Sequence, residues 1–140
     1  MRDAWEGVKW VPAHQYHITL AFLGDREDDL IEQASAEFGP VLKDFYSFDL
    51  AFAGEDRFGS ACSPRLLFLK VGRGKERLQE MLESLQPALE KHSMWEERTY
   101  RPHLTLGRPR RRGVRGPGNG SLLPPGMKSA TVGSFRVADV

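Results

Sequence analysis

The sequence predicts an α+β fold with a largely antiparallel sheet, formed by one domain that spans residues 1–140. Two segments have apolar residues at the three- and four-residue spacing of amphipathic helices, and five have the alternation or the continuous apolar character of strands. The predicted order is strand–helix–strand–strand–helix–strand–strand. Because strands follow one another directly in two places, this order is typical of antiparallel α+β folds.

Each element rests on a local pattern. The first strand alternates and stops at Gly24, and the first helix stops at Gly39-Pro40. The second strand leads to a predicted turn at residues 54–56, and the third is a nearly unbroken apolar run typical of a buried strand. The second helix has leucines at helical spacing and contains Pro87. The predicted strands cover residues 16–23, 45–53, 65–71, 100–107 and 129–137, and the helices cover 28–38 and 74–92.

Composition excludes several classes of protein. Cys62 is the one cysteine, which rules out an intrachain disulfide framework and fits a reducing cytoplasm. The chain has a formal net charge of +1, so any preference for anions must come from local clusters of charge. No apolar run is long enough for a membrane span, and the first residues are too polar for a signal peptide. Glycine and proline fill much of a predicted mobile loop at about residues 108–127.

Two His-x-Thr-x motifs carry the functional prediction: residues 17–20 (His-Ile-Thr-Leu) and 103–106 (His-Leu-Thr-Leu). In a strand, His17 and Thr19 point to one face and the aliphatic residues to the other, and the same holds for His103 and Thr105. If the two strands lie together, four polar side chains converge on one cleft. The threonine hydroxyls would then hold phosphoryl oxygens between the two imidazoles.

Two imidazoles suit acid–base chemistry, because the ordinary pKa of histidine, near 6.5, allows one ring to be neutral and the other protonated. We therefore predict that the pair moves protons without a metal or other cofactor. Arg108 can pair with a phosphate, although strict alternation puts it on the opposite face, so a bulge at Gly107 is needed to re-aim it. Either a phosphate ligand or a solvated arginine fits this position. The cluster from Arg110 to Arg115 is either a soluble loop or an RNA contact.

Both motifs and their flanks, Trp10-Val11-Pro12 before the first and Arg101-Pro102 before the second, resemble the RNA 2′,3′-cyclic phosphodiesterases. These enzymes are the 2′-5′ RNA ligase family of the two-histidine (2H) phosphoesterase superfamily. The resemblance implies two lobes in pseudo-two-fold arrangement, with flanking helices and a central groove that carries one motif from each lobe. Members usually extend further at both ends, so the resemblance also implies a shortened member.

The resemblance further implies roles for five residues. His17 matches the proton donor to the leaving 3′ oxygen, and His103 matches the base that activates water. Thr19, Thr105 and Arg108 match residues that hold the phosphate. The implied reaction opens a 2′,3′-cyclic phosphate at an RNA 3′ end to a 2′-phosphomonoester, by a monomer in the cytoplasm. The alternatives are a phosphodiesterase of small cyclic nucleotides or of ADP-ribose cyclic phosphate, 2′-5′ RNA ligation, and a non-catalytic module that binds RNA ends.

Overall fold

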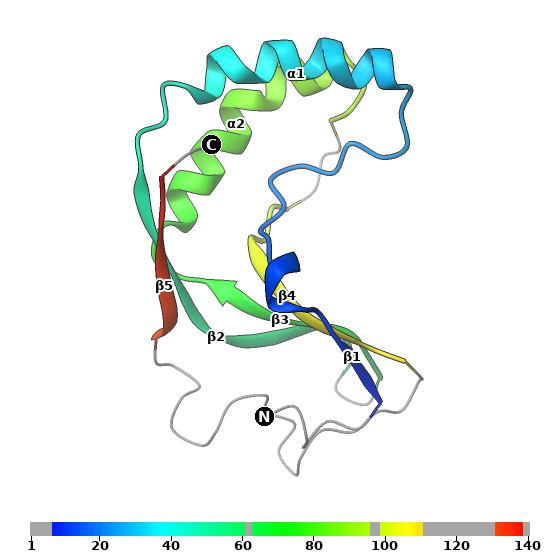
Figure 1. Cartoon of the computed structure of the whole chain (residues 1–140), viewed down its shortest axis with the longest axis vertical. Coiled ribbons are helices and arrows are strands. Elements are labelled where there is room, and N and C mark those ends of the chain that lie inside the picture. Colours follow the sequence, from blue (N-terminus) through cyan, green and yellow to red (C-terminus); the bar gives the residue numbers. More distant parts are fainter. Residues whose placement is uncertain (1–6, 61–62, 96–98, 111–130, 139–140) are drawn as a thin grey trace.

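A computed structural model describes residues 7–60, 63–95, 99–110 and 131–138. In these ranges the strands form one five-stranded sheet in the order β1-β4-β3-β2-β5, and every neighbouring pair is antiparallel (Figure 1). The predicted α+β class with an antiparallel sheet is confirmed. The strands are β1 (Val8–Trp10), β2 (Phe48–Ser60), β3 (Ser63–Val71), β4 (His103–Pro109) and β5 (Thr131–Val137), and the helices are η2 (Ala13–Gln15), α1 (Asp28–Leu42) and α2 (Lys75–Lys91).

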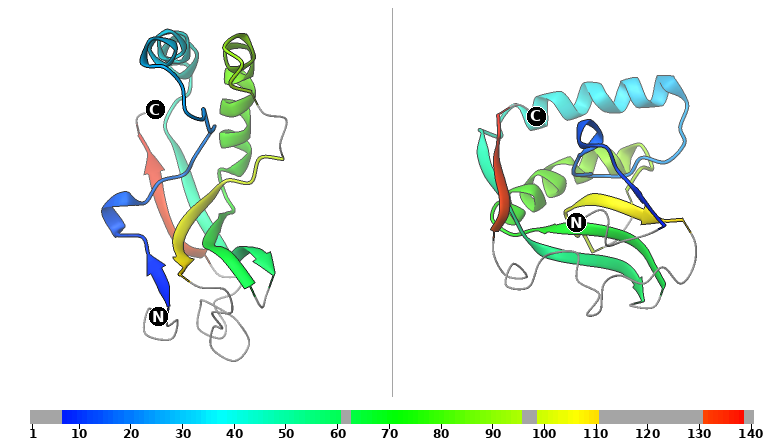
Figure 2. Two further views of the ribbon diagram at one scale, coloured as in Figure 1. Left: turned by 90° about the vertical axis from the view of Figure 1, so that its right-hand side faces the viewer. Right: turned by 60° about the horizontal axis from the view of Figure 1, so that its bottom comes forward.

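The two helices lie side by side next to the sheet, and α2 packs against both the sheet and α1 (Figures 1 and 2). One face of α2, which includes Leu78 and Met81, packs with the apolar face of the sheet around Leu50, Leu67 and Leu104. A second face of α2 packs against α1 in a separate cluster. Burial of these side chains is the main favourable contribution to folding, and it leaves the other face of the sheet to carry a functional site.

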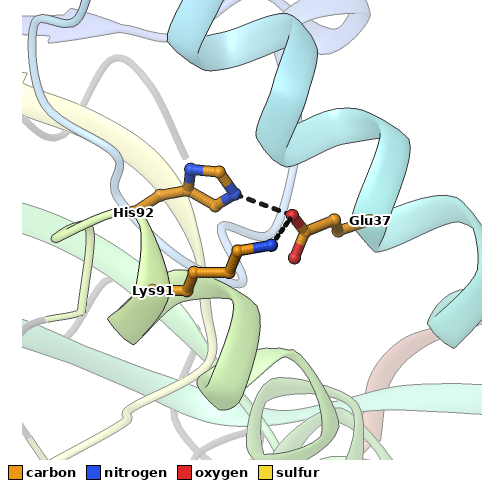
Figure 3. A network of polar contacts seen from close by, with 3 residues as sticks. All are labelled: Glu37, Lys91 and His92. Carbon is orange, nitrogen blue, oxygen red and sulfur yellow. Dashed lines mark hydrogen bonds and ion pairs between the residues drawn. The ribbon is translucent and has the colours of Figure 1, made fainter.

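A polar junction joins the two helices at the end of α2 (Figure 3). The Glu37 carboxylate on α1 accepts a hydrogen bond from Lys91 Nζ at 2.6 Å, and His92 Nε2 lies 3.1 Å from the same oxygen. The sequence predicts a long second helix that ends near His92, and the structure confirms it. His92 has a further role there, since it contacts the neighbouring helix.

The first helix is longer than its sequence predicts. Pro40 lacks the N–H that an interior helical position donates, so a stop at Gly39-Pro40 was expected. The helix instead continues to Leu42, and the Lys43 N–H bonds to the carbonyl of Gly39 at 3.1 Å. Val41 and Leu42 pack against the buried clusters, and this burial outweighs the cost of the proline.

The predicted turn at residues 54–56 is wrong, because β2 runs straight through it to Ser60. Phe52 pairs with Val71 while Glu55 pairs with Leu69, so β2 holds one extra residue in this interval. Gly54 has a φ of 73°, a left-handed conformation that suits a bulge. The glycine therefore bends the strand and does not reverse it.

The first predicted strand, residues 16–23, is also wrong as a continuous strand. Its one ladder contact is an antiparallel bridge between Ile18 and Leu104. The physical reason is that β4 begins at His103, opposite Thr19, so residues 20–23 run past its start, while the unpredicted strand β1 pairs with Gly107–Pro109 further along the same edge. The short helix η2 then turns the chain, so only Ile18 meets the remaining part of that edge.

The other strand predictions agree with β3, β4 and β5 to within a few residues. Cys62 and nearly all of the predicted mobile loop lie outside the described residues, as do Arg111, Arg112 and Arg115. Where the chain is described, no helix is long and apolar enough to cross a membrane.

Candidate active site

The Ile18–Leu104 bridge brings the two His-x-Thr motifs together. In an antiparallel pair, the residues on either side of a bridge lie opposite one another, so His17 faces Thr105 and Thr19 faces His103. All four point to the face opposite Ile18 and Leu104, which pack in the core. The pairing therefore gives the four polar side chains a local two-fold arrangement.

Both histidines are held by the same backbone contact. The Nδ1 of His17 lies 2.9 Å from the carbonyl oxygen of Gln15, and the Nδ1 of His103 lies 2.7 Å from that of Arg101. A carbonyl only accepts hydrogen bonds, so each Nδ1 carries the proton and donates it. Each Nε2 is then left to accept a proton when the ring is neutral and to donate one when it is protonated.

The surroundings of the two imidazoles differ. The His103 ring meets Phe58 edge-on at a centroid distance of 5.2 Å and lies 4.9 Å from Phe68, whereas the His17 side is more exposed. Phe58 and Phe68 also contact one another, with their centroids 4.6 Å apart. Two aromatic rings therefore fix the His103 ring, and Phe58 both packs in this cluster and faces the cavity.

All five predicted site residues line one cavity of about 460 Å³. This volume lies within the usual range for small-molecule sites. Its lining includes His17, Thr19, His103, Thr105 and Arg108, together with Val11, Gln15, Phe22, Phe58, Arg65 and Leu66. A second cavity of about 520 Å³ shares Thr19, Phe22, Phe58 and His103 with it and continues toward Trp95 and Tyr100.

A bulge in β4 explains how Arg108 reaches the cavity. Phe68 pairs with Thr105 while Leu67 pairs with Gly107, so β4 contains one extra residue in this interval. Leu106 and Gly107 are both buried, and the alternation is reset so that Arg108 shares a face with Thr105. The bulge that the sequence analysis required at this position is present.

Two residues near the motifs were not predicted. Arg65 lines the same cavity from β3, where it had been assigned only as the first residue of a buried strand. The Tyr100 hydroxyl donates a hydrogen bond to the carbonyl of Thr19 at 3.1 Å and so joins the second motif's flank to the first motif. Burial raises the pKa of Tyr100 to about 12, and its hydroxyl therefore stays protonated at neutral pH.

No cluster of three or more His, Cys, Asp or Glu side chains with the arrangement of a metal site occurs within the described ranges. His14 lies on η2, whereas His17 lies beyond that helix, beside the bridge to β4. The groups that meet in the cavity are thus imidazoles, hydroxyls and guanidinium ions. Together they form a site suited to proton transfer around an anionic phosphate.

Fold and site define an antiparallel α+β protein with a paired-histidine cavity. Comparison with known proteins identifies the class more closely. The sequence profile described as the 2′-5′ RNA ligase superfamily matches residues 2–114. The chain belongs to this superfamily, and the resemblance of its motifs is confirmed at that level.

Curated relatives carry the name RNA 2′,3′-cyclic phosphodiesterase. The protein from Bacillus subtilis (strain 168) is 34% identical over 102 residues, which cover 71% of this chain and 55% of the relative. That from Methanothermobacter thermautotrophicus is 29% identical over 143 residues, with 100% of this chain and 74% of the relative covered. The chain spans little more than half the length of the Bacillus relative.

Solved structures show the same fold. The crystal structure of TT0787 from Thermus thermophilus has a TM-score of 0.68 and 28% identity, covering 80% of this chain and 64% of that one. The Escherichia coli LigT structure, complexed with 3′-AMP, has a TM-score of 0.68 and 21% identity, covering 94% and 67%. At this level of identity the second likeness concerns the fold alone.

Proposed function

We propose that the chain hydrolyses 2′,3′-cyclic phosphate ends of RNA to 2′-phosphomonoesters by paired-histidine acid–base catalysis. The observation that carries this proposal is that His17, His103, Thr19 and Thr105 line one cavity, while both Nδ1 atoms are taken by backbone carbonyls and each Nε2 is left for proton transfer. The names of the curated relatives support the same reaction. A monomer is sufficient, because all of these groups come from one chain.

The proposed chemistry is a balanced displacement at phosphorus. His103 Nε2 takes a proton from water, whose oxygen forms a new bond to phosphorus. The bond from phosphorus to the 3′ oxygen breaks, and protonated His17 gives its Nε2 proton to that leaving oxygen. Thr19, Thr105 and Arg108 hold the non-bridging oxygens as negative charge grows on them. No step requires a metal or a cofactor.

The proposal includes two lobes that each contribute one motif, related by a pseudo-two-fold axis. The antiparallel bridge between Ile18 and Leu104 supports this arrangement, because an axis through such a bridge exchanges His17 with His103 and Thr19 with Thr105. A phosphate on that axis would have one imidazole on either side. This is the arrangement that an in-line attack and departure require.

Turnover of adenosine 2′,3′-cyclic phosphate and of a short RNA with a cyclic end, in excess chelator, tests the proposal. We expect a bell-shaped pH dependence and a 2′-phosphomonoester product. His17→Ala and His103→Ala should each lower kcat by about 10²-fold or more, while circular dichroism stays unchanged. His14→Ala is the matched control, since His14 is exposed on η2 and lies outside the lining of the cavity.

Retention of near wild-type turnover by either alanine variant would contradict the two-histidine mechanism. Binding of the cyclic substrate without turnover would support the alternative of a module that binds RNA ends. Preference for a mononucleotide over RNA would favour the small cyclic nucleotides as substrates. The product assay also separates hydrolysis from 2′-5′ ligation, because ligation consumes a 5′-hydroxyl end and lengthens the RNA.

A further inference from the structure

The cavity holds more positive charge than one phosphate needs. Arg65 and Arg108 both line it, and no carboxylate does so within the described part of the chain. Neither guanidinium forms an ion pair or a hydrogen bond with another described residue. Both cations are therefore available to a ligand, and guanidinium geometry matches phosphate oxygens.

Arg65 occupies its place because of a bulge of its own. Gly59 pairs with Pro64 and Phe58 pairs with Leu66, so Arg65 is the extra residue of β3 in this interval. In a regular strand, the neighbouring residues 65 and 66 would point to opposite faces of the sheet. In β3, Arg65 and Leu66 both line the cavity. Bulges commonly re-aim side chains beside functional sites. Two separate observations therefore indicate that Arg65 binds a ligand: the bulge places its side chain at the cavity, and its guanidinium has no partner among the described residues.

A count of charges shows which ligand group this would be. A cyclic phosphodiester carries a charge of −1, and its transition state approaches −2 as water adds. In the mechanism proposed above, His17 starts protonated and His103 gains the proton of the water, so the two imidazoles already balance −2. With Arg108 also held against the non-bridging oxygens, the charge on Arg65 has no counterpart on that phosphate. A second phosphate on the same substrate supplies the missing anion. In RNA, that group is the phosphodiester that joins the terminal nucleotide to the one before it.

We infer that Arg65 binds this neighbouring phosphodiester and that the site thereby selects an oligonucleotide end over a cyclic mononucleotide. The inference rests on the proposed function and names its substrate class. The second cavity of about 520 Å³ adjoins the first, so the groove offers more room than one phosphate group occupies. A mononucleoside cyclic phosphate would leave Arg65 without a partner.

The experiment compares the wild type with Arg65→Gln on two substrates: adenosine 2′,3′-cyclic phosphate and the dinucleotide ApA with the same cyclic end. Wild type should prefer the dinucleotide. Arg65→Gln should reduce the ratio of the two kcat/KM values about ten- to a hundredfold, mainly through KM, because one charge-assisted contact is lost. The salt dependence of log(kcat/KM) for the dinucleotide should also lose about 0.7 in slope.

Binding measurements keep this inference separate from the proposed function. Calorimetry with adenosine 2′-phosphate and with ApA 2′-phosphate requires no turnover, and the ratio of the two Kd values should change in Arg65→Gln by the same factor. Arg73→Gln, which changes an exposed arginine in the turn before α2, is the matched control and should keep the wild-type ratios.

Equal losses on both substrates would overturn the inference and would place Arg65 on the reacting phosphate. Unchanged ratios in both assays would overturn it as well, since Arg65 would then face only solvent. A wild type that binds the dinucleotide through Arg65 but turns over neither substrate contradicts the proposed function alone. A wild type that turns over both substrates with equal efficiency contradicts only the inference.

Discussion

Tyr100 and Thr19 are joined by a hydrogen bond between segments far apart in the sequence, since the Tyr100 hydroxyl donates to the Thr19 carbonyl oxygen at 3.1 Å. Tyr100 lies three residues before His103, and Thr19 lies two residues after His17. Together with the bridge at Ile18, this bond fixes one motif relative to the other. Tyr100 is therefore a positioning residue for the candidate site.

Tyr100→Phe removes that bond and should lower the free energy of unfolding by about 1 kcal/mol at pH 8. The pKa of Tyr100 is raised by burial to about 12 in the folded protein, above the ordinary value of 10. A raised pKa stabilises the fold below the unfolded pKa, and this contribution disappears as pH rises from 10 through 12. The stability difference between wild type and variant should therefore shrink over that range, as measured by urea unfolding.

The control for this prediction is Tyr46→Phe, because Tyr46 is 82% exposed. Its stability at pH 8 should equal that of the wild type. No stability difference at pH 8 would contradict the assigned bond, and a difference that stays constant from pH 8 to pH 12 would contradict the raised pKa. The kcat of Tyr100→Phe should fall as well, since small displacements of catalytic groups lower the rate.

Glu37→Gln should weaken the junction between α1 and α2. The hydrogen bond from Lys91, and after it the one from His92, holds the pKa of Glu37 below its usual value of 4.5. A lowered pKa stabilises the fold above the unfolded value, and that contribution disappears as pH falls through the folded value. The wild type should therefore have a higher urea midpoint than the variant at pH 7, and the difference should decline toward pH 3.

Glu32→Gln on the exposed side of the same helix provides the comparison, since the Glu32 side chain forms no hydrogen bond or ion pair with the described residues. Its midpoint should follow the wild type at both pH values. A Glu37→Gln midpoint that matches the wild type at pH 7 would show that the junction contributes nothing measurable, as is common for exposed ion pairs.

Gly107→Ala should separate β1 from β4. An added Cβ would lie 2.7 Å from Val8 Cγ1 and 3.1 Å from the carbonyl oxygen of Lys9, so the short strand β1 would have to move. We expect a loss of about 1–3 kcal/mol in the free energy of unfolding. Because Gly107 belongs to the bulge that directs Arg108, kcat/KM should fall too. Gly133→Ala is the control, since nothing lies within 4 Å of its added Cβ, and a similar loss there would contradict the steric explanation.

Local sequence patterns correctly predicted the helices and strands whose structure is determined by the apolar pattern of their own residues. The apolar stripe through Leu78, Met81 and Leu85 predicted α2 because those same side chains pack in the core. Alternation also predicted correctly that His103 and Thr105 share a face. Roles for the five predicted site residues remain predictions, although one cavity gathers them.

The errors arise where pairing across the sheet decides the structure. Residues 16–23 have a strand pattern, but their partner β4 begins only at His103, opposite Thr19, and the extent of a partner strand cannot be seen in a local window. Gly54 resembles a turn residue, but a continuing partner strand converts the turn into a bulge. Arg65 was missed for the same reason, since the extra residue of β3 is defined only by its register with β2.

The bulges beside Arg65 and Arg108 have a consequence for insertions and deletions in this family. Removing one residue from the bulge in β4 would restore an uninterrupted ladder and would redirect Arg108 away from the cavity, and removing the extra residue of β3 would remove Arg65 itself. Strand length at these two points thus determines which side chains line the cavity. A homologue with both arginines in an alignment, but one residue fewer in either strand, would have a differently charged groove.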